Sequence, residues 1–214
     1  FGWGDLKLAT FKDYKQEIMD AANNDRLRLA LTRAVKSFRG NIDDALKRFP
    51  HTVKLAEEVR EIKEKAIGDM EKLAQQASAS IVANHGKAYI ARTADEALGI
   101  IANLVGNGKL VVKGKSMTSE EIGLREHLEQ YGNEVYETDL GEFIIQKLGS
   151  RPMHILSPSI HVPREAVAKL FTEVMGKSFP ADTEIVTLVA AAREFLRDKF
   201  FRADIGISGA NVVA

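Results

Sequence analysis

The first part of the chain places its apolar residues at the spacing of amphipathic helices. One such run extends from Leu27 to Phe38, and a longer one extends from Val59 to Ala77. Gly40 and Pro50 interrupt the pattern, so we expect breaks there, with a short helix between them. The sequence therefore predicts an N-terminal helical segment over residues 1–84.

Beyond residue 85 short apolar runs alternate with helical patterns, which predicts an α/β domain over residues 85–214. The expected strands are 87–91, 109–113, 134–138, 154–157 and 204–208, and the expected helices are 93–104, 118–131, 139–147, 163–174 and 182–201. Thr93, Thr118, Asp139 and Asp182 have the side chains expected of helix N-caps. Strands separated by helices of this length favour parallel pairing with right-handed crossovers, so an open, mainly parallel sheet is predicted.

Ligands of open α/β sheets bind beyond the carboxyl ends of the strands. Four predicted strand exits are rich in polar side chains, and they cover residues 113–118, 138–142, 157–161 and 208–211. We expect these four loops to converge on one site.

The first exit has the strongest chemical pattern. Lys113 and Lys115 precede a helix start, which the Thr118 and Glu121 capping box predicts. Free N–H groups at a helix start, flanked by ammonium groups, favour an anion site. Ordinary helix capping is the alternative explanation of the same residues. A nucleotide-binding P-loop is excluded, because its first glycine would have to stand at Lys109.

The strand exits also supply candidates for proton transfer and for ligand binding. Those for general acid–base work are Glu121, Asp139, Glu142 and His161, and those for ligand binding are Lys113, Lys115, Ser116, Thr118, Ser157, Gly209 and Asn211. Helix capping and turn formation remain the alternatives for the carboxylates, the histidine and the glycine.

Composition excludes several classes of function. Thirty basic residues balance thirty acidic ones, which argues against nucleic-acid binding, and no apolar run is long enough to span a membrane. The chain has no cysteine, so it has no thiolate ligand for zinc or an iron–sulfur cluster, and its five histidines show no metal-binding spacing. We expect a cytoplasmic protein without a metal site. Because the sequence starts at Phe1, we also expect that a beginning is missing.

Four segments in a fixed order point to a family. They are KSMTSEEIGL at 115–124, ETDLGEFIIQ at 137–146, HILSPSIH at 154–161 and ADIGISGAN at 203–211. Together they resemble the LUD-domain family, and within it the iron–sulfur proteins of lactate utilisation. The resemblance covers residues 10 to 211 and implies a Rossmann-like fold similar to ribose-5-phosphate isomerase and CoA-transferases.

The resemblance also implies a function. These family members act with two companion proteins in oxidising L-lactate to pyruvate, and they carry [4Fe–4S] clusters in a cysteine-rich region after the LUD domain. That region is absent from this sequence. We therefore expect an incomplete domain, a processed fragment or a short form, with no cofactor of its own. Two hypotheses follow: the strand exits bind a small carboxylate or phosphorylated ligand, or the domain is a docking module for its partner subunits.

Overall fold

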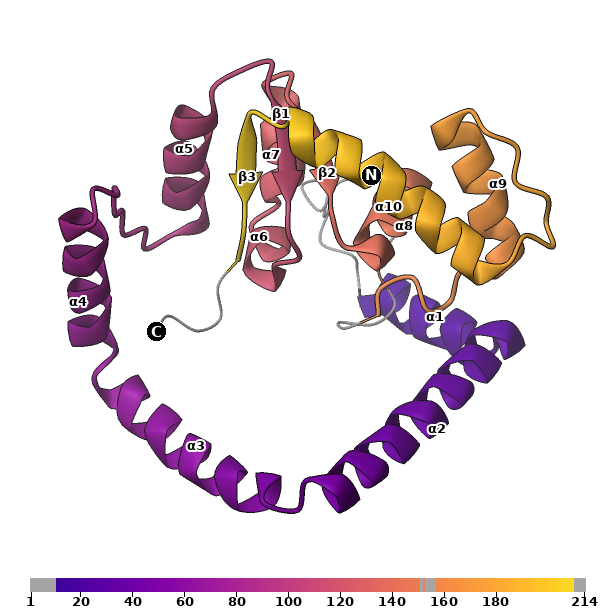
Figure 1. Cartoon of the computed structure of the whole chain (residues 1–214), viewed down its shortest axis with the longest axis horizontal. Coiled ribbons are helices and arrows are strands. Elements are labelled where there is room, and N and C mark those ends of the chain that lie inside the picture. The colour runs from indigo at the N-terminus through magenta and orange to yellow at the C-terminus, as the bar shows by residue number, and fades with distance from the viewer. Residues whose placement is uncertain (1–10, 151, 153–156, 210–214) are drawn as a thin grey trace. The chain divides into compact units, whose positions relative to one another are not determined.

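The computed structural model describes residues 11–150, 152 and 157–209, and these residues form two compact units. One unit contains the described residues up to Leu31 and those from Thr93 onward, and the other contains Thr32–Arg92. Figure 1 shows the elements in chain order.

The first helices of the chain are α1 (Phe11–Ala22), α2 (Asp25–Arg48), α3 (Thr52–Gly68) and α4 (Met70–Ala83). The helical character predicted for this segment is confirmed, and the chain breaks beside Pro50. The predicted break at Gly40 is wrong, because α2 runs through it. A single glycine costs a helix only about 1 kcal/mol relative to alanine, which a helix of 24 residues tolerates.

The α/β part follows the predicted alternation of elements. It consists of α5 (Ala94–Val105), β1 (Leu110–Lys113), α6 (Met117–Glu121), α7 (Leu124–Gln130), β2 (Glu134–Glu137), α8 (Leu140–Leu148), α9 (Arg164–Met175), α10 (Ile185–Arg202) and β3 (Ile205–Ile207). Three strands form one parallel sheet in the order β2-β1-β3, which confirms the predicted open, parallel α/β architecture.

Local signals explain where several of these helices begin and end. The Thr93 hydroxyl accepts a hydrogen bond from the Glu96 backbone N–H, so it caps α5 as predicted. Gly106 ends that helix with a φ of 73°, a conformation that glycine adopts without steric cost. The Asp139 carboxylate accepts from the N–H groups of Gly141 and Glu142 and caps α8, again as predicted.

Three local predictions are wrong. Residues 87–91 form no strand, and Tyr89 and Ile90 are exposed, because none of the described strands pairs with the segment. The Ser116 hydroxyl, rather than that of Thr118, accepts the N–H of Ser119 and caps α6. The helix expected to begin at Asp182 begins at Ile185 instead. The strand expected at 154–157 falls mainly outside the described residues.

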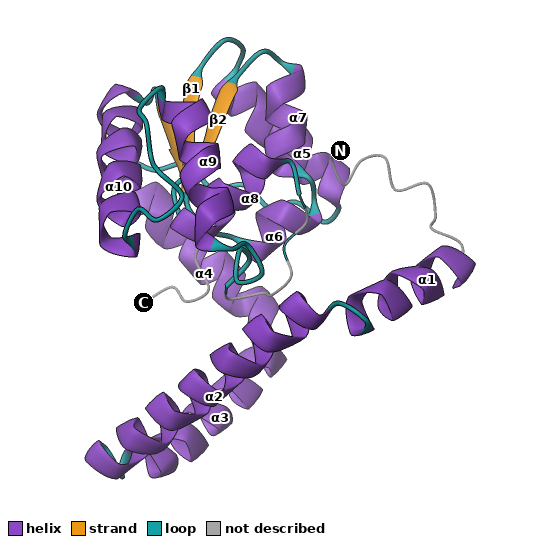
Figure 2. Ribbon diagram, turned by 90° about the vertical axis from the view of Figure 1, so that its right-hand side faces the viewer, coloured by secondary structure: helices purple, strands orange, loops and turns teal. Residues whose placement is uncertain are grey.

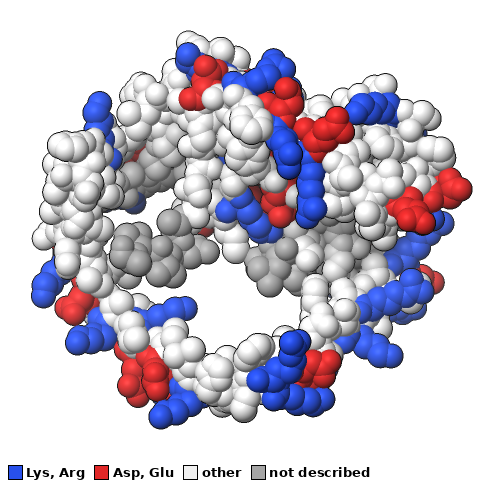
Figure 3. All heavy atoms as spheres, in the orientation of Figure 1, with Lys and Arg blue, Asp and Glu red and all other residues white. Residues whose placement is uncertain are grey.

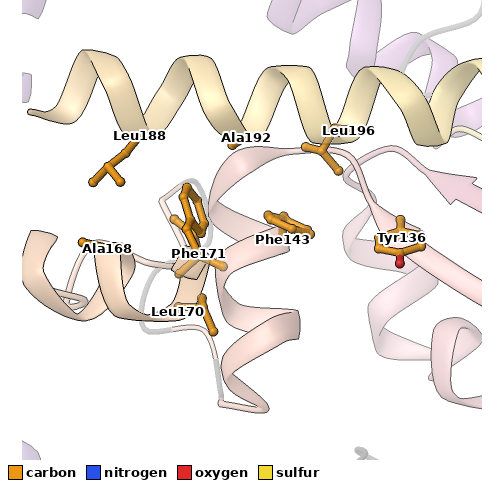
Figure 4. Close-up of a cluster of buried hydrophobic side chains, with 9 residues drawn as sticks. Tyr136, Phe143, Ala168, Leu170, Phe171, Leu188, Ala192 and Leu196 are labelled. Atoms are coloured by element: carbon orange, nitrogen blue, oxygen red, sulfur yellow. The ribbon is translucent and has the colours of Figure 1, made fainter. Parts of the chain in front are cut away.

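Helices cover both faces of the sheet (Figure 2). Side chains alternate between the faces along each strand, so Val111 and Val135 face one side and Tyr136 faces the other. The first face packs against α5 and α7, with Leu124 and Leu128 fully buried. On the second face lies a larger core under α8, α9 and α10. Figure 4 shows Leu188, Ala192 and Leu196 of α10 above the rings of Phe143 and Phe171.

Candidate functional site: a charge cluster at the ends of two strands

The carboxyl ends of β1 and β2 lie side by side in the sheet, and charged side chains meet there. The chain leaves β1 toward α7 on one face, and it leaves β2 toward α8 on the opposite face. Ligand sites of open α/β sheets lie where neighbouring strands send their connections to opposite faces. Five charged side chains gather at this point, and we call them the charge cluster: Lys113, Lys115, Glu120, Glu137 and Glu142.

A buried ion pair forms the base of the charge cluster. Lys113 lies opposite Glu137 in the register of β1 and β2, and its Nζ lies 2.9 Å from Glu137 Oε2. The two side chains are only 1% and 5% exposed. Burial raises the pKa of Glu137, although the Lys113 ammonium opposes that shift. Arg125 of α7 approaches the same carboxylate, with Nε 4.0 Å from Oε1.

A second ion pair of the charge cluster joins Lys115, which follows β1, to Glu142 of α8. Lys115 Nζ lies 3.0 Å from Glu142 Oε1, and the Glu142 side chain is buried in the first turn of α8. The Asp139 cap fixes that turn, so it also places Glu142. The ammonium group is buried, but its approach to Glu142 does not have the geometry of a hydrogen bond. Lys115 therefore keeps its hydrogen-bond donors for another acceptor.

Glu120 of α6 is the third carboxylate of the cluster. Its Oε1 is buried and has no hydrogen-bond partner among the described residues. Burial raises the pKa of Glu120, and the neighbouring Glu142 raises it further, while Lys113 and Lys115 act in the opposite direction. Within the described part of the chain, the cluster thus contains an ammonium group with an ion-pair partner but no hydrogen bond, and a carboxylate oxygen with no hydrogen bond. Buried polar groups without partners are rare and indicate a missing ligand or water molecule.

The structure brings together three of the residues selected from the sequence, namely Lys113, Lys115 and Glu142. Ser116 lies beside them as the cap of α6. Thr118, Glu121 and Asp139 are exposed. The sequence analysis selected Glu121, but the carboxylate that lies in the charge cluster is that of the neighbouring Glu120.

The other strand exits lie close to these loops. A Cβ atom added at Gly209 would lie 2.5 Å from the Cβ of Ser116, so the exit of β3 contacts the exit of β1 and requires glycine there. Similarly, a Cβ atom at Gly141 would lie 3.0 Å from Cγ of Pro158, which places the loop after Ser157 against the start of α8.

His161 follows that loop and is half-buried. Burial lowers its pKa, and its Nδ1 is buried and has no hydrogen-bond partner in residues 11–150, 152 and 157–209. Ser157 is also half-buried, and Asn211 lies outside the described residues.

Sequence analysis did not select Glu120 or Glu137 as candidate site residues. The sequence does contain a signal for Glu137. Residues two apart in a strand share one face, so Glu137 lies on the face of Val135 in β2 and Lys113 lies on the face of Val111 in β1, and the two charges meet on the same side of the sheet. No comparable signal distinguishes Glu120 from its neighbour, because the orientation of α6 depends on its cap.

Within residues 11–150, 152 and 157–209, no three His, Asp or Glu side chains gather as metal ligands. None of the helices in the described part of the chain has the length and apolar character needed to cross a bilayer.

Comparison with known proteins gives a consistent family match. The model of the LUD domain matches residues 74–214. The chain is 35% identical over 209 residues to lactate utilization protein B of Bacillus licheniformis, covering 96% of this chain and 43% of that protein. It is 34% identical to lactate utilization protein B of Bacillus subtilis, with the same coverage.

A further relative has a different name. The chain is 31% identical over 201 residues to an uncharacterized electron transport protein of Escherichia coli, YkgF, covering 93% of this chain and 42% of that protein. The chain thus spans less than half the length of these curated relatives. No solved structure matches it significantly.

Proposed function

The chain belongs to the LUD-domain family, and from this premise we propose that its charge cluster binds a 2-hydroxycarboxylate, L-lactate, as part of a lactate-utilisation system. The observation that carries the proposal is a pair of buried groups in the charge cluster, Lys115 Nζ and Glu120 Oε1, neither of which has a hydrogen-bond partner among the residues that the structure describes. A carboxylate accepts hydrogen bonds from an ammonium group, and a hydroxyl group donates one to a carboxylate. A 2-hydroxycarboxylate carries both partners on adjacent carbon atoms.

The electrostatics of the cluster assign a role to each residue. Lys115 binds the ligand carboxylate, and Lys113 and Glu137 form the rigid, buried base of the site. Glu120 accepts the hydrogen bond of the hydroxyl group. Its raised pKa makes it a stronger base than an ordinary glutamate once it is ionised.

Oxidation of lactate to pyruvate releases two electrons and two protons, and this chain supplies only part of that chemistry. Glu120 accepts the hydroxyl proton. The chain has no cysteine and so offers no thiolate ligand for the [4Fe–4S] clusters that the resemblance implies. The hydrogen on C2 leaves with the two electrons, so this part of the reaction requires a redox carrier outside residues 1–214. The proposed role of this chain is to bind and orient the substrate.

Two substitutions with opposite effects test this site. Lys115→Met removes the cation and should weaken L-lactate binding at least about tenfold, the loss of a charge-assisted hydrogen bond. Glu142→Gln removes the carboxylate that competes for Lys115 and should strengthen binding. Lys169→Met, on an exposed lysine of α9, is the matched control and should leave affinity unchanged. Titration calorimetry measures all four proteins, and unchanged affinity in both cluster variants would refute the proposal.

A docking role is the second candidate function, and the helices of the second unit favour it. None of residues 32–92 is buried, although α2 presents Val35, Ile42 and Leu46 on one face at helical spacing. Helices of this kind need a packing partner for stability. Lys and Arg side chains lie along α2 in Figure 3, and the helix carries seven of them against three Asp. A companion subunit with an acidic rim around an apolar groove would match this surface.

Co-purification with the companion lactate-utilisation proteins tests the docking role. Replacing Val35, Ile42 and Leu46 together with serine should abolish co-purification and leave L-lactate binding intact. The control replaces Arg33, Lys36 and Lys47, on the polar side of α2, with glutamine. It should weaken association at low salt, and the difference from the unsubstituted protein should disappear at high salt, where these charges are screened. Retention of the companions by the serine variant would contradict docking through this face.

A further inference from the structure

A second candidate binding site lies on the helix that follows the larger core. A cavity of about 480 Å³ is lined by Thr138, Arg193, Leu196, Arg197, Phe200 and Phe201. Five of these residues lie on α10 at positions i, i+3, i+4, i+7 and i+8, so they share one helix face. Thr138 follows β2 directly, so one wall of the cavity lies at the carboxyl end of that strand. Its volume is within the range of small-molecule sites, roughly 300–1,000 Å³.

Two arginines of the cavity carry uncompensated charge. Arg193 and Arg197 have no acidic partner among the residues that the structure describes. The acidic side chains of the same helix form ion pairs with other residues. Glu194 Oε1 lies 3.4 Å from Lys177 Nζ, and Asp198 Oδ2 lies 3.1 Å from Arg202 Nη1. Guanidinium groups one helical turn apart can bind one phosphate group together, because each offers a planar pair of N–H donors.

The rest of the cavity wall is apolar and aromatic. Phe200 is 56% exposed and Phe201 is 86% exposed, while Leu196 is buried behind them. Exposed phenylalanine rings next to unpaired arginines form a surface with one apolar and one cationic part. Flat ring systems stack on such aromatic side chains without requiring specific hydrogen bonds.

We propose that this cavity binds a phosphate monoester that carries a flat ring system, a ligand of the mononucleotide class. Arg193 and Arg197 hold the phosphate, and Phe200 stacks on the ring. Thr138 does not contribute a free donor, because its hydroxyl donates to the Lys113 carbonyl oxygen, 3.0 Å away. The site uses no residue of the charge cluster.

Three probes separate the two parts of the ligand. AMP carries both parts, inorganic phosphate carries only the charge, and adenosine carries only the ring. Titration calorimetry of the whole chain should give an affinity for AMP at least about tenfold higher than for either fragment, since two contacts act together on one molecule. Absence of AMP binding, or binding of phosphate as tight as that of AMP, would overturn the proposal.

Substitutions then locate the bound AMP. Arg197→Met and Phe200→Ala should each weaken AMP binding about tenfold or more, and both side chains are exposed, so circular dichroism should remain that of the unsubstituted protein. Arg33→Met removes an equally exposed arginine from α2 and should have no effect. Lys115→Met should also retain AMP binding, which distinguishes this cavity from the charge cluster. AMP affinity that is unchanged in both cavity variants would refute this location.

Discussion

Lys113 and Glu137 face each other across neighbouring parallel strands, with Nζ 2.9 Å from Oε2 and both side chains closed to solvent. Removing one partner of such a pair leaves a buried charge without compensation. Lys113→Met should therefore lower the free energy of unfolding by about 3–5 kcal/mol in urea denaturation. The double variant Lys113→Met/Glu137→Leu should recover most of this loss, because it leaves no unpaired charge. A double variant as unstable as the single one would contradict the pairing.

The cap of α6 gives a prediction in which two hydroxyl residues are compared. Ser116→Ala removes the acceptor of the Ser119 N–H and should lower the free energy of unfolding by about 1 kcal/mol. Thr118→Ala, at an exposed position inside the helix, should change it by less than about 0.5 kcal/mol. Thermal and urea unfolding of both variants measure the difference. A larger loss of stability in Thr118→Ala than in Ser116→Ala would indicate that Thr118, and not Ser116, caps α6.

Glu120 should make stability depend on pH. Burial and the nearby Glu142 hold the pKa of Glu120 above its ordinary value of 4.5, so the folded protein binds the proton more tightly than the unfolded chain does. The contribution of Glu120 to the free energy of unfolding therefore falls as pH rises from 4.5 through the folded pKa. Glu120→Gln has no carboxyl group to ionise at this position, so it avoids this loss of stability at high pH. The variant should be more stable than the unsubstituted protein at about pH 8 and should approach it at about pH 4.

Urea denaturation at the two pH values measures this effect. Glu120 also raises the pKa of Glu137, so Glu120→Gln relieves both carboxylates and the two contributions have the same sign. Glu121→Gln is the matched control, because its carboxylate is exposed on the same short helix. A difference between Glu120→Gln and the unsubstituted protein that stays constant with pH would contradict the buried environment of Glu120.

Asn133 should be the most sensitive polar residue outside the charge cluster. Its buried side chain accepts the Lys109 N–H at 2.8 Å and donates to the carbonyl oxygens of Gly106 and Leu128 at 2.9 and 3.0 Å. Asn133→Ala leaves the Lys109 N–H and the Gly106 carbonyl oxygen without these partners, while the Leu128 carbonyl oxygen still accepts the Tyr131 N–H. The substitution should cost about 2–3 kcal/mol of unfolding free energy. Asn107→Ala, at an exposed turn position, is the control. Equal stability of the two variants would contradict this role.

Much of the fold could be predicted because its signals are local. The apolar runs of β1 and β2 and the caps of α5 and α8 lie within a few residues of the elements that they define. The strand predicted at residues 87–91 failed for a non-local reason. Its composition suits a strand, but a strand needs a neighbour to accept its hydrogen bonds, and sequence pattern alone does not supply one.

The site was predicted less completely, and one structural cause explains the main error. Ser116 and Thr118 both carry a hydroxyl group, and the choice between them depends on where the chain leaves the sheet. Gly114 N–H donates to the carbonyl oxygen of Ile207 on β3, which fixes that point through tertiary structure. The cap at Ser116 sets the rotation of α6. That rotation turns Glu120 into the cluster and leaves Glu121 in solvent.

The most direct measurement for the proposed function compares L-lactate with propionate, which lacks only the hydroxyl group. If Lys115 binds the carboxylate and Glu120 accepts the hydroxyl hydrogen bond, L-lactate should bind at least about tenfold more tightly than propionate. Glu120→Gln should reduce this preference while propionate binding stays the same. Equal affinity for the two acids, or no binding of either, would contradict the assignment of the charge cluster as a 2-hydroxycarboxylate site.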